Sequence, residues 1–430
     1  MTITLGIVGL IALLALRVPV ATSLGVVAIT AVIFEDGFTK APVIAAQAMV
    51  NGVNSFVLIA APFFMLAGEI MNQGGISRRI YRVAHALVGW VPGGLGQVNI
   101  LGSMFFAGMT GSAISDAVGL GTMEIKAMNE RGYEKKFSAS ITAASSLLGP
   151  IIPPSVPMVI YGAVAGASIG QLFLAGVVPG ILMGISLMIA VWIYALRGYC
   201  PREPKPTAPE LKAALIGAVP SLLIPLFVVG GIYAGLFTPT EAAVAACAYA
   251  LILATIYREL TFDELSRIVV RTVVATGALF FIVATTALLG FVVTRSGVMI
   301  EVALWLGQEI KSPTVLLLLI VGLYLLVGLF MEPIAAMLLL VPILLPGVKL
   351  LGIDLVHFGI VTVLALCIGL LTPPVGLVLY TIARIADLRA DVLAIAVLPF
   401  LLPLVIVLVL VVIFPELSLA LPRFLASLSW

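Results

Sequence analysis

Charged and metal-binding side chains are scarce in this sequence. Only 10% of its 430 residues are charged, whereas 62% are hydrophobic and the mean hydropathy is +1.26. Cysteine occurs three times and histidine twice, which excludes a disulfide framework and a histidine-rich metal centre. No clustered set of nucleophile, base and acid is visible, so an enzyme active site is not indicated. We therefore expect a membrane protein that is not an enzyme, holds no transition metal and has no nucleic-acid partner.

Apolar runs long enough to cross a bilayer fill most of the chain. They predict an all-α polytopic membrane protein with about ten membrane spans, two re-entrant helical hairpins and two broken helices. The first run follows Met1 without a basic segment or a small-residue cleavage site. This start favours a retained helix over a signal peptide.

Two similar breaks interrupt the apolar runs. The first is GPIIPPS at 149–155, and the second is GLLTPPV at 369–375. Upstream, Gly108 and Gly328 are separated by the same distance along the chain as the first glycines of the two breaks. Paired Gly/Pro breaks at corresponding places in two hydrophobic halves are typical of the binding site of a secondary transporter. The alternative is a pair of proline kinks whose freed backbone groups are satisfied by neighbouring helices.

This constant separation, which we call the repeat register, divides the chain into two halves, 1–197 and 213–430. A polar, proline-rich cytoplasmic linker at 198–212 joins them. The parts predicted in the first half are scaffold helices at 1–73, an amphipathic arm at 77–90, a hairpin at 94–128 and a broken helix at 137–165. The corresponding parts of the second half are 214–295, 297–310, 313–351 and 356–386, followed by a last span at 392–414.

The distribution of basic residues predicts the orientation in the membrane. With the N-terminus outside and both hairpins re-entrant, 17 of the 22 Lys and Arg residues (22 − 5) fall on the cytoplasmic side. The five that remain outside are Lys40, Arg295, Lys311, Lys349 and Arg423. This asymmetry follows the positive-inside rule. It also makes the halves inverted repeats, because the corresponding hairpins enter from opposite faces.

The tip of the first hairpin is rich in small and hydroxyl-bearing residues. Thr110, Ser112 and Ser115 supply hydroxyl oxygens, and Asp116 follows one turn later. Such oxygens at exposed helix ends favour a sodium site, and an acid at membrane depth is a functional candidate because it is costly there. The alternative is a packing interface of small residues between helices.

The tip of the second hairpin carries Glu332 before Pro333, and in the repeat register Glu332 corresponds to Ser112. Glu332 could bind an ion, or it could only cap the helix that Pro333 begins, and one residue can do both. The carbonyl oxygens freed at the two breaks would face the same ions.

In this order and spacing, several motifs resemble those of the large membrane subunit of the tripartite ATP-independent periplasmic (TRAP) transporters, over essentially the whole chain. The motifs are Gly111-Ser112 to Asp116, Arg131-Gly132-Tyr133, the break at 149–155, Thr238 to Ala243, Val341 to Pro346, His357-Phe358-Gly359 and Gly369 to Gly376. The resemblance implies an elevator-type transporter that uses Na⁺ as its coupling ion to import a small organic acid, such as a C4-dicarboxylate or a sugar acid.

The resemblance also implies partners and a location. We expect a bacterial inner-membrane protein with a periplasmic N-terminus, a periplasmic substrate-binding protein that delivers the anion, and a small membrane subunit. The sequence begins without a fused small-subunit segment, so we expect that subunit to be a separate chain.

The residues of three sites follow from the same resemblance. One sodium site would comprise Thr110, Ser112, Asp116, Gly149, Ile152 and Pro154. The second would comprise Gly328, Glu332, Gly369, Thr372 and Pro373. The substrate would lie between the hairpin tips, against Gly111, Ser112, Pro153, Ser155, Met331 and Pro374. Many relatives carry Asp where this chain has Glu332, which leaves direct ion binding by the longer side chain open.

Two other functions were considered, and one of them remains open from the sequence alone. A carboxylate permease of similar inverted-repeat architecture, coupled to Na⁺ or H⁺, would transport without any binding protein. A scaffold protein without transport activity would not need two paired helix breaks.

Overall fold

The computed structural model describes residues 6, 8–10, 12, 13, 16, 18–198, 200, 201, 204–298 and 310–427, with the backbone alone at 109 and 110. All regular elements in this part of the chain are helices. The prediction of an all-α protein is therefore confirmed. Most of the first predicted helix and most of the second arm, 297–310, lie outside the described residues.

Several helices are suited to cross a membrane. Among the described residues six are long and apolar enough, or seven if the bent pair α20 and α21 forms one span. The six are Phe56–Gln73, which comprises η1 (Phe56–Ile59) and α4 (Ala60–Gln73), then α11 (Ile169–Leu196), α12 (Ala208–Tyr233), α13 (Pro239–Tyr257), α14 (Phe262–Arg295) and α17 (Pro333–Leu350). Shorter apolar helices are α3 (Ala41–Val53), α10 (Val156–Ala165), α16 (Pro313–Gly328) and α18 (Leu355–Gly369). The polytopic membrane character is thus confirmed.

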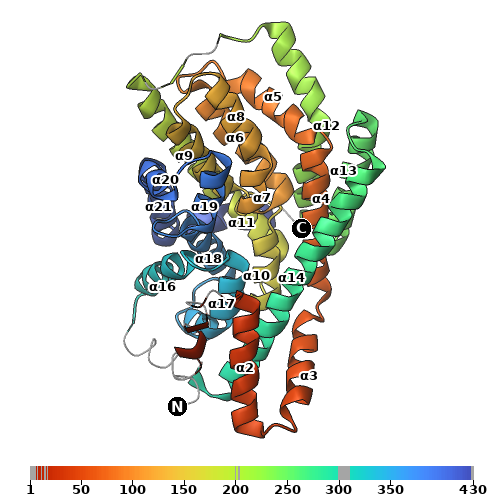
Figure 1. The fold of residues 1–430 in the computed structure, drawn as a ribbon, viewed down its shortest axis with the longest axis vertical. Coiled ribbons are helices and arrows are strands. Elements are labelled where there is room, and N and C mark those ends of the chain that lie inside the picture. Colours follow the sequence, from red (N-terminus) through yellow and green to blue (C-terminus); the bar gives the residue numbers. More distant parts are fainter. Residues whose placement is uncertain are drawn as a thin grey trace.

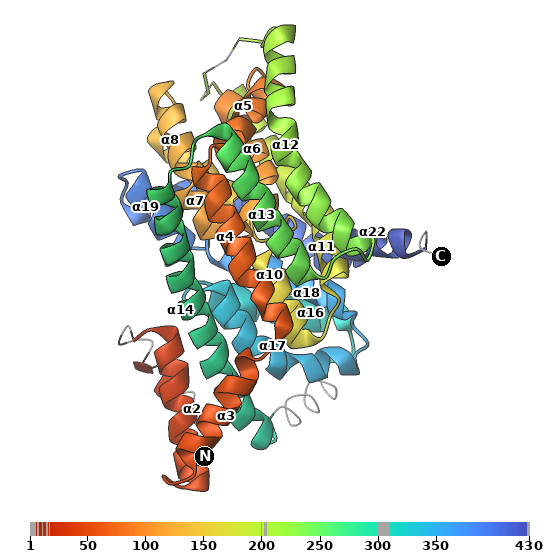
Figure 2. The same cartoon turned by 90° about the vertical axis from the view of Figure 1, so that its right-hand side faces the viewer.

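One group of helices, which we call the frame, consists of α2 (Val20–Asp36), α3, α4, α12, α13 and α14. The long helix α14 packs against α2, α3 and α4, and α13 packs along α4, so that these helices lie side by side (Figure 2). Capping boxes start three of them, with Thr207 and Glu210 at α12, Thr238 and Glu241 at α13, and Thr261 and Glu264 at α14. Each box satisfies amide groups that the first turn leaves free, which fixes where the helix begins.

The remaining helices, except the arm α5 (Ile76–Val88), form a second group, which we call the core bundle (Figure 1). Its members from the first half are α6 (Gly94–Thr110), α7 (Ala113–Val118), α8 (Leu120–Glu130), α9 (Lys135–Ser145), η2 (Ser146–Leu148), α10 and α11. Those from the second half are α16, α17, α18, α19 (Leu377–Ile385), α20 (Ala390–Ala396), α21 (Leu398–Ile413) and α22 (Glu416–Ala426). The arm α5 (Ile76–Val88) packs between α6 of the core bundle and α12 of the frame.

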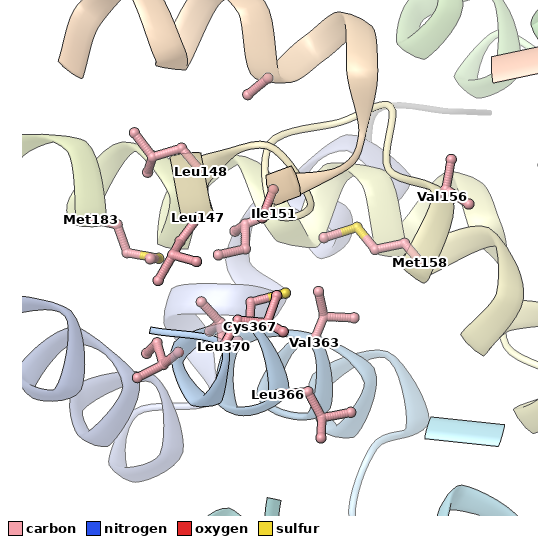
Figure 3. Packing of buried hydrophobic residues seen from close by; sticks show 14 of the residues in the cluster. Leu147, Leu148, Ile151, Val156, Met158, Met183, Val363, Leu366, Cys367 and Leu370 are labelled. Carbon is pink, nitrogen blue, oxygen red and sulfur yellow. The ribbon is translucent and has the colours of Figure 1, made fainter. Parts of the chain in front are cut away.

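Apolar side chains join the two halves of the core bundle. Leu147 of η2 and Ile151 of the first break point toward Cys367 of α18 and Leu370, which directly follows α18, and all four are buried (Figure 3). Burial of such side chains is the main favourable contribution to packing in the parts of the bundle that lipid does not reach. The first break and α18 are therefore held together as one unit.

Helix boundaries in the two halves follow the repeat register of the sequence. Helix α17 at 333–350 corresponds to α7 and α8 at 113–130, and α18 at 355–369 corresponds to α9 and η2 at 135–148. The two halves thus have the same order of elements in these regions.

Some predicted helices are divided or new. The last predicted span, 392–414, consists of α20 and α21, which meet at an angle of 55°, since Pro399 lacks the amide hydrogen needed to continue α20. The second arm of the first hairpin is interrupted at Gly119, between α7 and α8. Helix α22 follows α21 and was not predicted; its Ser418 hydroxyl lies 2.8 Å from Nδ1 of His357 on α18.

Candidate functional site

A cavity of about 460 Å³ lies where the frame meets the core bundle. Helices α4 and α14 of the frame form one wall, while both hairpin tips, the first break and α18 form the other. Segments that are far apart in the sequence thus meet at one place. The volume falls within the range of pockets that hold small ligands.

The tip of the first hairpin fits closely against the first break. Gly111 has a φ of +59°, and a Cβ on it would lie 2.8 Å from the nitrogen of Val156 and 3.1 Å from the carbonyl oxygen of Pro154. A Cβ on Gly149 would lie 3.2 Å from the carbonyl oxygen of Ser112. The lack of a side chain at both glycines therefore allows the two backbones to approach each other.

This contact brings together part of the first predicted sodium site, namely Ser112, Gly149 and Pro154. Ser112 also begins α7, where its hydroxyl accepts a hydrogen bond from the Ser115 amide at 3.4 Å. The start of a helix, a hydroxyl oxygen and free carbonyl oxygens are groups that interact with small ions. The side chain of Thr110, also predicted for this site, lies outside the described part of the structure.

Ile152 and Asp116 complete the predicted first site. Of its described members only Ser112 lines the cavity, whereas Gly149, Pro154, Ile152 and Asp116 do not. The Ile152 side chain packs against Gly180 of α11. In a site of this kind Ile152 can therefore contribute only its backbone oxygen.

Asp116 belongs to a buried polar cluster inside the first hairpin. Asp116 and Glu124 are each 1% exposed, and they are close enough for their charges to interact. The Ser103 hydroxyl lies beside Asp116, yet no well-formed hydrogen bond reaches any of the four carboxylate oxygens within the described residues. Nearby, the amide of Asn99 donates to the hydroxyl of Thr142 at 2.7 Å. Two buried carboxylates are costly unless a proton or a cation offsets their charge.

The tip of the second hairpin places Glu332 on the cavity wall. Its Oε2 accepts hydrogen bonds from the amides of Ile334 at 2.9 Å and Ala335 at 3.2 Å, and it caps α17. The predicted helix-capping role of Glu332 is thus confirmed. Both amides use the same oxygen, so Oε1 remains for a ligand in the cavity, and ion binding stays a prediction.

The second tip and the second break also approach each other closely. A Cβ on Gly328 would lie 3.0 Å from the Cα of Gly369, and the amide of Gly376 donates to the carbonyl of Leu329 at 3.2 Å. The hydroxyl of Thr372 donates to the carbonyl four residues earlier at 2.8 Å. The structure therefore brings Gly328 and Gly369 of the second predicted sodium site together. Of the five residues predicted for this site, Glu332 is the one in the described lining of the cavity; Gly328, Gly369, Thr372 and Pro373 do not line it.

Only part of the predicted substrate set lines the cavity. Gly111 and Ser112 do so. The residues that do not line it in this structure are Pro153, Ser155, Met331 and Pro374. Ser155 shapes the first break instead, because its hydroxyl donates to the carbonyl of Pro150 and accepts from the amide of Met158. The peptide bonds between the paired prolines of both breaks are cis.

The frame contributes polar residues that the sequence did not assign to a site. Glu69 and Asn72 of α4, with Arg271 and Thr272 of α14, line the cavity. Their signal in the sequence was weak. Glu69 and Arg271 are charges within apolar helices, but no motif links α4 with α14, or either of them with the hairpin tips.

The chain is similar in sequence to the large permease proteins of tripartite transporters. The sequence profile of the DctM component of tripartite ATP-independent periplasmic transporters matches residues 7–417. The sialic acid TRAP transporter large permease protein SiaM of Vibrio cholerae is 44% identical over 381 residues, which cover 88% of this chain and 89% of that protein.

Two further relatives have other substrates in their names. The 2,3-diketo-L-gulonate TRAP transporter large permease protein YiaN of Escherichia coli is 38% identical and is covered to 88%, over 87% of this chain. The C4-dicarboxylate TRAP transporter large permease protein DctM of Pseudomonas aeruginosa is 37% identical and is covered to 87%, over 86% of this chain. Among solved structures, the YdaH transporter of Alcanivorax borkumensis has a TM-score of 0.62 at 14% identity over 88% of both chains, which is a similarity of fold.

Proposed function

The chain belongs to the DctM component family of the tripartite ATP-independent periplasmic transporters, and on this premise we propose that it is the large membrane subunit of a sodium-driven importer of a small organic acid. As a member of this family it is a transporter permease and not an enzyme. The substrate would be a carboxylate, such as a C4-dicarboxylate or a sugar acid. The relatives named for sialic acid, 2,3-diketo-L-gulonate and C4-dicarboxylates support this class of substrate.

The observation that carries the proposal is the cavity between the frame and the core bundle. One of its walls comes from α4 and α14, and the other comes from both hairpin tips, the first break and α18. A movement of the core bundle along the frame would carry the hairpin tips and breaks past α4 and α14 while leaving each group internally packed. This arrangement supports an elevator mechanism in which the core bundle transports the substrate.

The topology that we propose has two inverted repeats with ten spans and two re-entrant hairpins. The constant register between corresponding helices supports the repeat, and the short apolar helices α10, α16 and α18 are the elements that form hairpins and broken spans in this scheme. With the basic residues gathered on one side, the N-terminus would be periplasmic and the protein would lie in the bacterial inner membrane.

Sodium ions would bind on either side of the cavity. One site would use oxygens around Ser112, Gly149 and Pro154, and the other would use Glu332 with the backbone near Gly369. Each site joins a hairpin tip to a helix break, so an ion would hold the two segments in the closed arrangement. Tip closure would then depend on both ions and substrate, and this dependence is what couples their movement.

Sodium coupling is energetically sufficient for uptake of an anion. Each positive charge that moves inward across 100 mV supplies about 2.3 kcal/mol. Two sodium ions carried with a singly charged anion would thus move one net charge and supply about 2.3 kcal/mol, in addition to the chemical gradient of sodium. A doubly charged anion would need a third ion to retain this electrical driving force.

The proposed partners follow from the tripartite system. A periplasmic binding protein would deliver the substrate, and a small membrane subunit encoded as a separate chain would pack against the frame. The exposed apolar side chains on α12 and α14, including Leu226, Phe227 and Val273, offer a surface for lipid or for that subunit.

Uptake by proteoliposomes tests the proposal. The chain would be reconstituted with its small subunit, and uptake of labelled sialic acid, 2,3-diketo-L-gulonate and succinate would be measured with and without the binding protein. We expect uptake only when the binding protein and an inward Na⁺ gradient are both present. Uptake without the binding protein would instead identify a self-sufficient permease, and uptake with a K⁺ gradient alone would refute sodium coupling.

A further inference from the structure

Charge in the cavity is unevenly distributed over its two walls. Three charged side chains line it, namely Glu69 and Arg271 from the frame and Glu332 from the second hairpin tip. An anionic substrate would be repelled by the two carboxylates, and Glu332 already directs one oxygen toward the start of α17. Within the described lining, Arg271 is the one basic side chain that can attract a carboxylate.

Arg271 is not committed to another partner in the described part of the chain. No salt bridge within 4.0 Å joins it to Glu69 or Glu332, whereas Arg295 at the other end of α14 is held by Asp36. Arg271 is also exposed to the cavity. Its guanidinium group therefore retains all its donors for a ligand.

The neighbouring Thr272 gives independent evidence for a ligand at this place. Its side chain is only 7% exposed and lines the cavity, yet its Oγ1 has no hydrogen-bond partner among the described residues. A threonine in a helix can bond the carbonyl one turn earlier, as Thr285 does in the same helix at 3.0 Å. Thr276 and Thr286 of this helix also lack a partner among the described residues, but neither of them lines the cavity. A buried hydroxyl without such a bond is costly unless a ligand or a water molecule satisfies it.

We propose that Arg271 and Thr272 of α14 bind the carboxylate group of the transported acid, so that the frame and not only the hairpin tips recognises the anion. This inference rests on the proposed function. The planar guanidinium donates two parallel hydrogen bonds to a carboxylate, and the hydroxyl donates a third. The rest of the substrate then lies against the small and apolar residues farther along α14, such as Ala275 and Ala278, and against the tip at Ser112.

The position of these residues on the frame has a consequence for the transport cycle. If the core bundle moves, the hairpin tips keep their own contacts with the substrate but leave Arg271 behind. The acid is therefore bound more tightly in conformations that place the tips beside α14 than in those that do not. Differential binding of this kind biases the distribution between conformations and helps release the acid after movement.

Discrimination between an acid and its neutral ester tests the proposal. In proteoliposomes with the small subunit and binding protein, Na⁺-driven uptake would be measured for whichever of sialic acid, 2,3-diketo-L-gulonate and succinate the wild type transports. Direct binding of that acid and of its methyl ester to the purified membrane complex would be measured alongside. We expect the wild type to prefer the acid. Arg271→Gln should reduce that preference roughly 10- to 100-fold, in the range found for hydrogen bonds to charged groups. Arg271→Lys and Thr272→Val should each reduce it by a smaller factor.

Arg267 provides a matched control. It lies one turn earlier on α14, is exposed and does not line the cavity. Arg267→Gln should keep the wild-type preference for the acid. The proposal is overturned if Arg271→Gln and Arg271→Lys keep that preference too, or if Arg267→Gln loses it equally. If the wild type binds and transports none of the three acids tested above, the proposed function fails. If the wild type does transport an acid and both Arg271 variants keep its preference for the acid over the ester, only the role of Arg271 is rejected.

Discussion

Replacement of Gly111 by alanine tests whether sodium binding depends on the close contact between the first hairpin tip and the first break. A matched glycine elsewhere controls for the backbone strain that alanine itself introduces. Gly111 has φ +59°, and an added Cβ would lie 2.8 Å from the Val156 nitrogen, whereas ordinary contacts begin near 3.4 Å. The tip must therefore move by about 0.6 Å (3.4 − 2.8) relative to the first break. Gly166 is a matched control in the same bundle, because its φ is +70° and nothing lies within 4 Å of an added Cβ.

Both alanine variants introduce backbone strain, but only Gly111→Ala also disturbs the proposed sodium site. Each places alanine in the left-handed region, which costs about 1–2 kcal/mol of stability. Only Gly111→Ala also displaces oxygens of the proposed first sodium site, and ion coordination tolerates distance errors of only about 0.2 Å. We expect Gly111→Ala to raise the half-saturating Na⁺ concentration for uptake by at least about tenfold, and Gly166→Ala to leave it unchanged.

Initial uptake rates in proteoliposomes at a series of Na⁺ concentrations measure this effect, and thermal unfolding of the purified proteins reports the shared cost. Equal Na⁺ dependence in Gly111→Ala, Gly166→Ala and the wild type would refute the close approach of tip and break as the basis of the first site. Loss of uptake in both variants, with equal losses of thermal stability, would assign the effect to backbone strain instead.

Three further changes test other parts of the structure. Glu332→Gln keeps an oxygen that can cap α17 but removes the charge, so we expect normal unfolding temperatures with a weaker Na⁺ dependence of uptake; unchanged Na⁺ dependence would contradict a role in ion binding. Asp116→Asn removes one of two neighbouring buried charges, so the variant should be at least as stable as the wild type in K⁺ but should lose the stabilisation that Na⁺ gives the wild type in thermal unfolding. Asp36→Asn breaks an ion pair in which Arg295 is 46% exposed, so it should cost at most about 1 kcal/mol of stability and leave uptake unchanged; a large loss of uptake would show that Arg295 acts beyond this pair.

The positions where helices end at the two breaks and at the two predicted hairpin tips were predictable from the sequence because their signals are local. Glycine and proline mark the positions where a helix cannot continue, and the repeat register identified Ser112 and Glu332 as corresponding sites before any contact was known. The structure places both at the same cavity. The division of the last span at Pro399 was missed, since proline within a few residues of a helix start is compatible with either one helix or two.

The second wall of the cavity was not predictable in this way. In the sequence Arg271 was only one of many basic residues on the predicted cytoplasmic side, and Glu69 stood at the end of an apolar run. Their approach to the hairpin tips depends on how α4 and α14 pack against the core bundle. Such packing depends on contacts between segments that are far apart along the chain, and a single sequence carries no local sign of them.

The equal spacing of the two halves does not extend to the chemistry of the two hairpins. In the repeat register, the buried acids Asp116 and Glu124 correspond to Ala336 and Leu344. The surrounding polar residues Asn99, Ser103 and Ser145 correspond to Leu319, Leu323 and Ala365. The interior of the second hairpin thus consists of apolar side chains at the positions where the first hairpin has a polar cluster. The one acidic residue of the second hairpin, Glu332, lies at its tip. Burial of apolar side chains carries no desolvation penalty, whereas two buried carboxylates are destabilising unless a proton or a cation neutralises them. The stability of the first hairpin should therefore depend on the ions or protons bound in its interior, and that of the second should not. The interior of the first hairpin is consequently the part of the core bundle whose stability should respond most strongly to Na⁺. Thermal unfolding of Glu124→Gln in Na⁺ and in K⁺ would measure that response separately from transport.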